Sequence, residues 1–190
     1  LDDAINELKE TDFKDLFSRE LEEKARLIVQ DCSIETDLEI LIPDVYVNNI
    51  SERLQLYSRL DNIKDESQLN QFMEEVRDRF GPLPPSAEEL INTVRLRWLG
   101  EKLGFERLSL KNGKMRAFFI SNNEKYFSSD EFGHILSYVQ KHPRNCKMKD
   151  IGGKAVLVTE GIKTVDAAKE LLRQMERQTE VKSVNEILSR

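Results

Sequence analysis

The dipeptide Asn112-Gly113 is the strongest local constraint on how this chain folds. It separates residues 105–111 from residues 114–120, and both segments have the composition of strands. Both positions of a two-residue hairpin turn need a positive φ, which Asn and Gly adopt more readily than other residues. The sequence therefore predicts an antiparallel hairpin in the second half of the chain.

A second hairpin is predicted further along. Residues 146–149 and 154–159 read as strands and flank Gly152-Gly153. Hairpins that follow one another in sequence favour a largely antiparallel sheet over one in which single strands alternate with helices.

The first half of the chain combines one strand with three helices. Apolar and polar residues alternate from Cys32 to Ile40, the two-residue period of a strand, and Pro43 ends this strand. Apolar residues then recur at helical spacing in three segments, 50–63, 66–80 and 86–103. The stripes expected to face the core are Ile50, Leu54, Tyr57 and Leu60, then Leu69, Phe72, Met73, Val76 and Phe80, then Leu90, Ile91, Val94, Trp98 and Leu103.

The ends of these helices also carry sequence signals. Gly81 and Gly104 follow the second and third apolar stripes and are expected to terminate both helices with a positive φ. Ser86 and Glu89 have the spacing of a capping box, in which the hydroxyl and the carboxylate bond each other's backbone amides. We therefore expect the third helix to begin at Ser86.

Two more helices are predicted in the second half. Ser128 and Glu131 have capping spacing and precede a helix that His142-Pro143 closes, and Thr164 caps the last helix. Residues 179–190 are polar and are expected to form a tail with a last turn near residues 184–188.

These elements predict an α+β fold. Its sheet is mixed but largely antiparallel, with a three-helix insertion after the first strand and further helices packed on the sheet. We expect one domain over residues 25–178, preceded by an arm of residues 1–24 and followed by the tail of residues 179–190. The chain begins with Leu rather than Met, which indicates a piece of a longer protein.

Charge is distributed unevenly along the chain. The net charge is −6, but residues 1–80 hold 10 basic and 21 acidic side chains, whereas the remaining residues hold 19 and 14. No segment approaches the ~18 consecutive apolar residues of a membrane helix, and no signal peptide begins the chain. We expect a cytoplasmic domain that does not contact membranes.

Cys32 and Cys146 are too few for a disulfide framework and are expected to be buried hydrophobic residues.

Catalytic and metal-binding motifs are not recognisable. Gly161 and Lys163 lack the spacing of a phosphate-binding loop, so Thr164 is interpreted as a helix cap. His134, His142 and Cys146 form an incomplete ligand set, which favours surface histidines and a core cysteine over a zinc site. No nucleophile elbow is present. The sequence thus predicts no catalytic, cofactor-binding or metal-binding residues in this chain.

Two charged surfaces remain as candidate binding sites. Basic residues concentrate in 95–116 and in 141–154, which leaves open a nucleic-acid-contacting role, although no base-stacking or recognition-helix motif accompanies them. On a helical projection of residues 66–80, Glu75 and Asp78 lie three residues apart on the side opposite the apolar stripe. This pair is either an ordinary solvated surface or a site of protein docking.

The chain resembles the C-terminal domain of the bacterial transcription-repair coupling factor (TRCF) over about residues 27–178. The residues that carry this resemblance are Leu41-Ile42-Pro43-Asp44-Val45-Tyr46-Val47, Arg53-Leu54, Tyr57, Arg59-Leu60, Glu75, Asp78-Arg79-Phe80-Gly81-Pro82-Leu83-Pro84, Arg95 and Leu103-Gly104. Residues 1–24 resemble the end of that protein's motor region and its linker.

This resemblance implies a role in a larger DNA-repair protein. The larger protein would contain an ATP-dependent motor that holds ATP and Mg²⁺ and works on double-stranded DNA. That protein would release RNA polymerase stalled at lesions and recruit nucleotide excision repair. By this resemblance, the terminal domain is expected to be no enzyme and to need no cofactor. It is likewise expected to dock on a UvrB-like N-terminal module and to mask the surface that binds UvrA. The positions that match the docking residues are Glu75 and Asp78.

Overall fold

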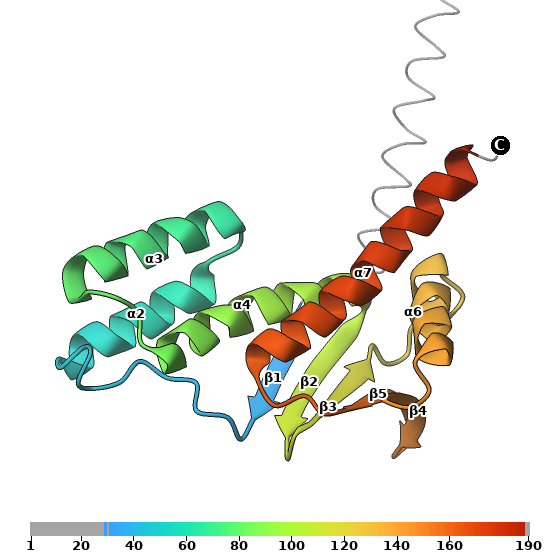
Figure 1. Ribbon diagram of the computed structural model, residues 1–190, viewed down its shortest axis with the longest axis horizontal. Coiled ribbons are helices and arrows are strands. Elements are labelled where there is room, and N and C mark those ends of the chain that lie inside the picture. Colours follow the sequence, from blue (N-terminus) through green and yellow to red (C-terminus); the bar gives the residue numbers. More distant parts are fainter. Residues whose placement is uncertain (1–28, 30, 189–190) are drawn as a thin grey trace, which may run out of the picture.

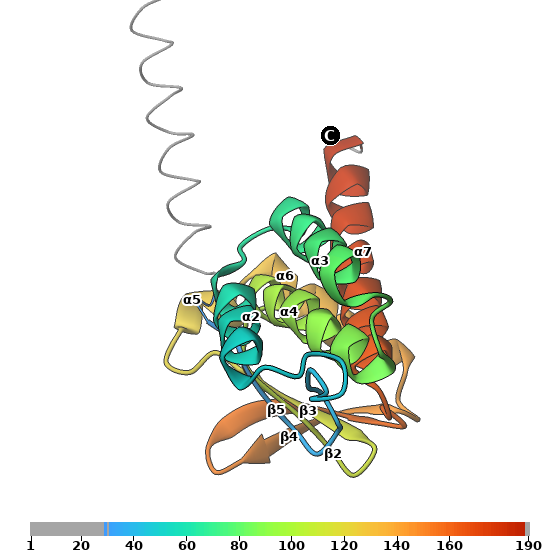
Figure 2. The same ribbon diagram turned by 90° about the vertical axis from the view of Figure 1, so that its left-hand side faces the viewer.

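The computed structural model describes residue 29 and residues 31–188. The predicted arm of residues 1–24 lies outside the described residues. Figure 1 labels every element except α5, which Figure 2 labels. The bounds of the elements are β1 (Ser33–Thr36), α2 (Ile50–Asn62), α3 (Glu66–Phe80), α4 (Pro85–Leu103), β2 (Phe105–Lys111), β3 (Lys114–Phe119), α5 (Glu124–Phe127), α6 (Asp130–Lys141), β4 (Cys146–Ile151), β5 (Lys154–Glu160) and α7 (Val165–Leu188).

The strands form one mixed sheet in the order β1-β2-β3-β5-β4. β1 pairs with β2 in parallel, and every other neighbouring pair is antiparallel. The predicted α+β fold is therefore confirmed, including its largely antiparallel sheet and the insertion of α2, α3 and α4 after the first strand. The turn between β2 and β3 has a positive φ at both Asn112 (55°) and Gly113 (67°), as predicted.

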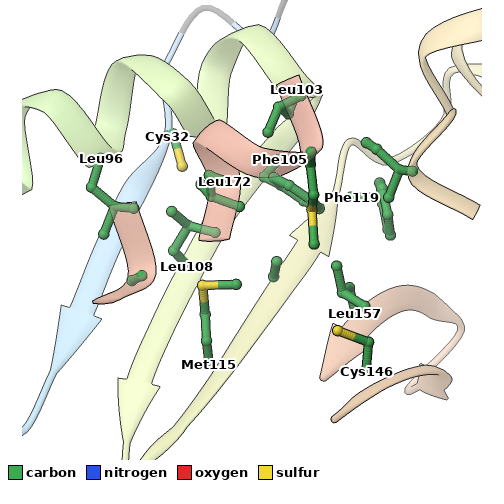
Figure 3. Close-up of a cluster of buried hydrophobic side chains, with 14 of the residues drawn as sticks. Cys32, Leu96, Leu103, Phe105, Leu108, Met115, Phe119, Cys146, Leu157 and Leu172 are labelled. Carbon is green, nitrogen blue, oxygen red and sulfur yellow. The ribbon is translucent and has the colours of Figure 1, made fainter. Parts of the chain in front are cut away.

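Helices lie on one side of the sheet, as Figure 2 shows, and the main core fills the space between the two layers. Figure 3 shows Leu108 and Met115 of the sheet facing Leu96 of α4 and Leu172 of α7. The buried members of this main core are Cys32, Leu96, Leu103, Phe105, Leu108, Leu110, Met115, Ala117, Phe119, Tyr126, Ile135, Tyr138, Cys146, Leu157, Val165, Ala168, Leu172 and Met175.

A separate helical core joins α2, α3 and α4. Its buried members are Ile42, Val47, Leu56, Leu60, Leu69, Phe72, Val76, Ile91 and Val94. The helix α4 contributes Ile91 and Val94 to this core and Leu96 and Leu103 to the main core. Because α4 is apolar on two sides, it connects the three-helix insertion to the sheet.

Two predictions for the first half of the chain are wrong in detail. β1 ends at Thr36 instead of continuing to Ile40, because the Thr36 hydroxyl accepts a hydrogen bond from the Leu38 amide (2.9 Å) and turns the chain. Ile50 and Leu54 do not face the core, since they are 66% and 63% exposed. The helix α2 instead buries Leu56 and Leu60, while its neighbouring side forms ion pairs with α3.

Two predicted helix starts are also wrong. The helix α4 begins at Pro85, whose ring fixes the φ of a first-turn residue, and no side chain caps it. Ser86 therefore lies inside the first turn. The cap of α6 is Ser129, whose hydroxyl accepts from the Phe132 amide, whereas Ser128 ends α5. The helix α7 continues to Leu188, through residues expected to form a tail.

Candidate protein-docking face

The helix α3 presents an acidic surface because its opposite side is buried. Asp65 caps the helix by accepting a hydrogen bond from the Gln68 amide (2.8 Å), and Gly81, with φ 88°, ends it. Burial of Leu69, Phe72 and Val76 turns the other side of α3 to solvent. We call the exposed carboxylates Glu74, Glu75 and Asp78 the acidic face.

Glu75 already has a partner within the domain. Its Oε2 lies 2.6 Å from Nη2 of Arg59 on α2, and both side chains are nearly half exposed. The Arg59 guanidinium also lies 5.2 Å from the centroid of the Phe72 ring. A cation that approached Glu75 would therefore compete with Arg59 for this carboxylate.

Asp78 is exposed and has no ion pair or side-chain hydrogen bond among the described residues. The same holds for Glu74, which precedes Asp78 by one helical turn on the same surface. Glu74 is not one of the predicted docking residues, although its spacing of four residues from Asp78 places it on the same side of the helix. The two unpaired carboxylates are the part of the acidic face best able to attract a basic partner.

A polar hollow adjoins the acidic face between α2 and α3, with a volume of about 300 Å³. Its lining residues are Ser58, Arg59, Asn62, Ile63, Gln68, Gln71, Phe72 and Glu75. Its walls offer carboxylate, amide and hydroxyl groups to a side chain from a partner.

Ion pairs fix the helices that carry the acidic face. Arg79 of α3 pairs with Glu52 of α2 (2.7 Å), and Arg95 of α4 holds Glu66 of α3 through its Nε and Nη2 atoms. Exposed pairs contribute only about 0.2–1 kcal/mol each. Their role here is orientation, because they link α3 to both of its neighbours.

The first basic segment, 95–116, is largely neutralised. Its ion pairs are Arg95–Glu66, Arg97–Asp61, Lys102–Glu176, Arg107–Glu35, Lys111–Glu35 and Lys114–Glu160. The sequence could not reveal these partners, because most lie far along the chain. Arg116 is the one cation of this segment's predicted set for which the described part of the chain shows no ion pair.

The candidate metal ligands do not come together. Across the described residues, no three His, Cys, Asp or Glu side chains are placed to hold a metal ion. His142 is exposed, and its Nδ1 lies 2.8 Å from the Tyr138 carbonyl. The expectation that both histidines lie at the surface is wrong for His134, which is buried by the packing of α6.

Both cysteines are buried, as predicted. Burial raises the pKa of the Cys32 thiol to about 12, and the carboxylates of Glu101 and Asp31 act in the same direction. Burial also raises the pKa of Cys146, although a hydrogen bond with Thr159 opposes this effect. Neither thiol therefore has the lowered pKa of a reactive nucleophile.

Thr164 is a helix cap, as predicted. Its hydroxyl accepts a hydrogen bond from the Ala167 amide (3.0 Å) at the start of α7. A carboxylate also supports this end of α7, because Oε2 of Glu89 accepts from the Val165 amide (2.7 Å). Glu89 thus caps α7 and not α4, contrary to the predicted capping box.

No helix in the described part of the chain is long and apolar enough to cross a membrane.

Comparisons with known proteins give a consistent match. The sequence model of one protein family, described as the TRCF domain, matches residues 36–141, more than half of the chain. The transcription-repair-coupling factor of Rickettsia bellii is 34% identical over 118 residues, which cover 62% of this chain and 10% of that protein. The corresponding factor of Escherichia coli is 28% identical over 146 residues, which cover 77% of this chain and 11% of that protein. The chain thus spans about a tenth of the length of these relatives.

The fold also matches a solved structure. The crystal structure of the C-terminal domain of transcription-repair coupling factor superposes with a TM-score of 0.63 and 16% sequence identity. The match covers 80% of this chain and 96% of that domain. At this identity the match establishes a common fold.

Proposed function

Because the chain belongs to the TRCF domain family, we propose that it is a non-catalytic regulatory domain of a transcription-repair coupling factor. In this proposal it docks on a UvrB-like N-terminal module of the same protein and masks the surface that binds UvrA. The remainder of the protein would be an ATP-dependent translocase on double-stranded DNA that releases stalled RNA polymerase. Engagement of the motor would release the docked domain and allow excision repair to be recruited.

The observation that carries this proposal is the acidic face on α3. Asp78 is exposed without a partner in the described region, and Glu75 lies one turn of helix away. Charge-assisted hydrogen bonds contribute roughly 1.5–3 kcal/mol when both groups are desolvated. Two such contacts with basic residues of the module would hold a closed state that a change of a few kcal/mol could open.

Docking is tested by titrating the separately produced UvrB-like module into this chain. We expect Asp78→Asn to weaken binding by about tenfold, equivalent to roughly 1.4 kcal/mol. The matched control is Asp130→Asn on α6, because Figure 1 places this helix far from α3. An Asp78→Asn variant that binds as tightly as the parent chain would contradict docking through this face.

Arg59→Gln provides a test of opposite sign. This change removes the internal partner of Glu75 and a positive charge that would repel basic residues of the module. We expect tighter docking of this variant. Weaker docking would show that Arg59 itself contacts the module.

Masking is tested in the full-length protein. The double variant Glu75→Gln with Asp78→Asn is expected to bind UvrA more tightly than the parent protein, because the module is unmasked. Unchanged UvrA affinity, together with lost docking, would separate docking from autoinhibition and overturn the second part of the proposal.

A further inference from the structure

The sheet face turned away from the helices has no described helix upon it, as Figure 2 shows. We call it the outer face. Strand pairing places on this face basic residues from both predicted basic segments. They are Arg107, Lys111, Lys114, Arg116, Lys147, Lys149 and Lys154.

The centre of the outer face is apolar but covered. Phe118, Val156 and Val158 form a buried cluster separate from both cores, with exposures of 7%, 0% and 6%. Arg107 stacks on this cluster, with its guanidinium carbon 3.8 Å from the centroid of the Phe118 ring. Long basic side chains snorkel in this manner, with their stems on apolar atoms and their charges in water. The outer face therefore presents charge to solvent and keeps its aromatic ring covered.

Several of these cations are neutralised by neighbouring carboxylates. Glu35 pairs with Arg107 and Lys111, Glu160 pairs with Lys114, and Glu106 pairs with Lys154. Among the described residues, Arg116, Lys147 and Lys149 have no ion pair or side-chain hydrogen bond. These three residues carry the uncompensated charge of the outer face.

The register of the sheet places these three residues together. Arg116 of β3 and Lys147 of β4 both pair with Val158 of β5 and lie on either side of it. Strand spacing separates them by about 10 Å, and Lys149 lies about 7 Å from Lys147 along β4. A nucleic-acid strand carries one charge per ~3.4 Å of helix axis, so each cation would contact a different phosphate.

We propose that the outer face binds the phosphate backbone of a nucleic-acid duplex through Arg116, Lys147 and Lys149. Phosphate contacts need only charge and hydrogen-bond donors, which these side chains provide. An acidic protein would be anchored by apolar side chains in the centre of its interface, but here the apolar cluster is covered. Single-stranded nucleic acid would need exposed aromatic rings for base stacking, and Phe118 is buried.

The test is titration of the 190-residue chain with a fluorescent DNA duplex of arbitrary sequence at 50–200 mM salt. Three phosphate contacts predict a slope of about −2.7 for log affinity against log salt, which is a loss of about 40-fold over this range. The variant Arg116→Gln, Lys147→Gln, Lys149→Gln keeps side chains over the apolar cluster and removes the charge. We expect it to bind at least tenfold more weakly at 50 mM salt, with a slope near zero.

The matched control carries Lys64→Gln between α2 and α3, Arg77→Gln on α3 and Lys125→Gln on α5, which is the same loss of charge. Figure 2 shows these helices on the other side of the sheet. It should bind as the parent chain does. Absence of duplex binding at 50 mM salt, or equal losses in both variants, would overturn the proposal. If polyglutamate of equal charge binds as tightly as the duplex and the outer-face variant loses both, the site fits an acidic protein and the duplex assignment is wrong.

Discussion

At the scale of single residues, Gly104 shows how one position joins the end of α4 to β2. Its φ of 88° and ψ of 24° are left-handed, and an added Cβ would lie 2.2 Å from Cε2 of Tyr126. The Tyr126 hydroxyl donates to the Leu103 carbonyl (2.6 Å), which holds the ring against the glycine. The sequence predicted the helix terminator, but it could not predict the ring, because Tyr126 lies on α5, beyond both strands of the β2–β3 hairpin.

Gly104→Ala is expected to destabilise the chain by about 2–5 kcal/mol, through backbone strain and the clash with Tyr126. Urea unfolding followed by circular dichroism measures this loss. Gly133→Ala on α6 is the control, since its Cβ would meet nothing within 4 Å. It should leave stability unchanged or raise it by up to about 1 kcal/mol. Equal effects of the two changes would refute the steric explanation.

At the scale of elements, one carboxylate of α4 caps the start of α7. Glu89 accepts from the Val165 amide, and its negative charge lies at the positive end of the α7 dipole. We expect Glu89→Ala to lower the free energy of unfolding by about 1–2 kcal/mol, as for the loss of a helix cap. The neighbouring exposed Glu88, changed to Ala, should cost less. Thermal unfolding of both variants decides between a specific cap and a general effect of charge.

The ion pair between Glu106 of β2 and Lys154 of β5, two strands that flank β3, should respond to acid. Partial burial alone would raise the pKa of Glu106, but hydrogen bonds from Lys154 and Ser121 outweigh this effect and lower it. A folded-state pKa below the unfolded value of about 4.5 stabilises the fold above that pH. This contribution is lost as pH falls through the lower, folded-state pKa.

Glu106→Gln should therefore destabilise the chain at neutral pH, and its difference from the parent chain should shrink as the pH falls below about 4.5. Urea unfolding at a series of pH values measures this difference. A difference that stays constant with pH would contradict the assigned ion pair with Lys154.

Elements were predicted well where the signal was local. Turn dipeptides and alternation located the strands, and apolar periodicity located α2, α3 and α4. Some failures have local causes, such as Pro85 at the start of α4, and others depend on contacts that are distant in sequence. The orientation of α2 depends on how it packs against α3 and α4, a packing that includes pairs such as Arg59–Glu75. Beyond the turn that the Thr36 hydroxyl makes at the end of β1, Asp37 accepts a hydrogen bond from the Asn112 amide (2.9 Å). Neither partner is adjacent in sequence.

At the scale of the whole molecule, two cores share α4. Loss of a buried leucine costs about 2–5 kcal/mol, and an element with its own core can open before the rest of the domain. Leu69→Ala should therefore accelerate hydrogen exchange in α2 and α3 while β3 and β5 remain protected. Equal acceleration in the sheet would show that the two cores unfold together.

The charge asymmetry seen along the sequence is also resolved only in the whole molecule. The acidic face could be located from helical periodicity, and the exposure of Glu75 and Asp78 agrees with that projection. The pairing of Glu75 with Arg59 could not be predicted, because it requires the packing of two helices. The two basic segments meet because β5 lies between β3 and β4, an order that no local pattern specifies.

The parallel pairing of β1 with β2 has a consequence for synthesis. Ser33 pairs with Arg107, and the whole three-helix insertion lies between them in sequence. At about 5–20 residues per second, a ribosome needs several seconds to make this insertion. β1 therefore leaves the ribosome before its partner β2 has been made. During this time its backbone N–H and C=O groups are unpaired, and unpaired strands can associate with other chains. Ser33 and Glu35, which flank its one apolar residue Ile34, make β1 a poor template for aggregation during this interval.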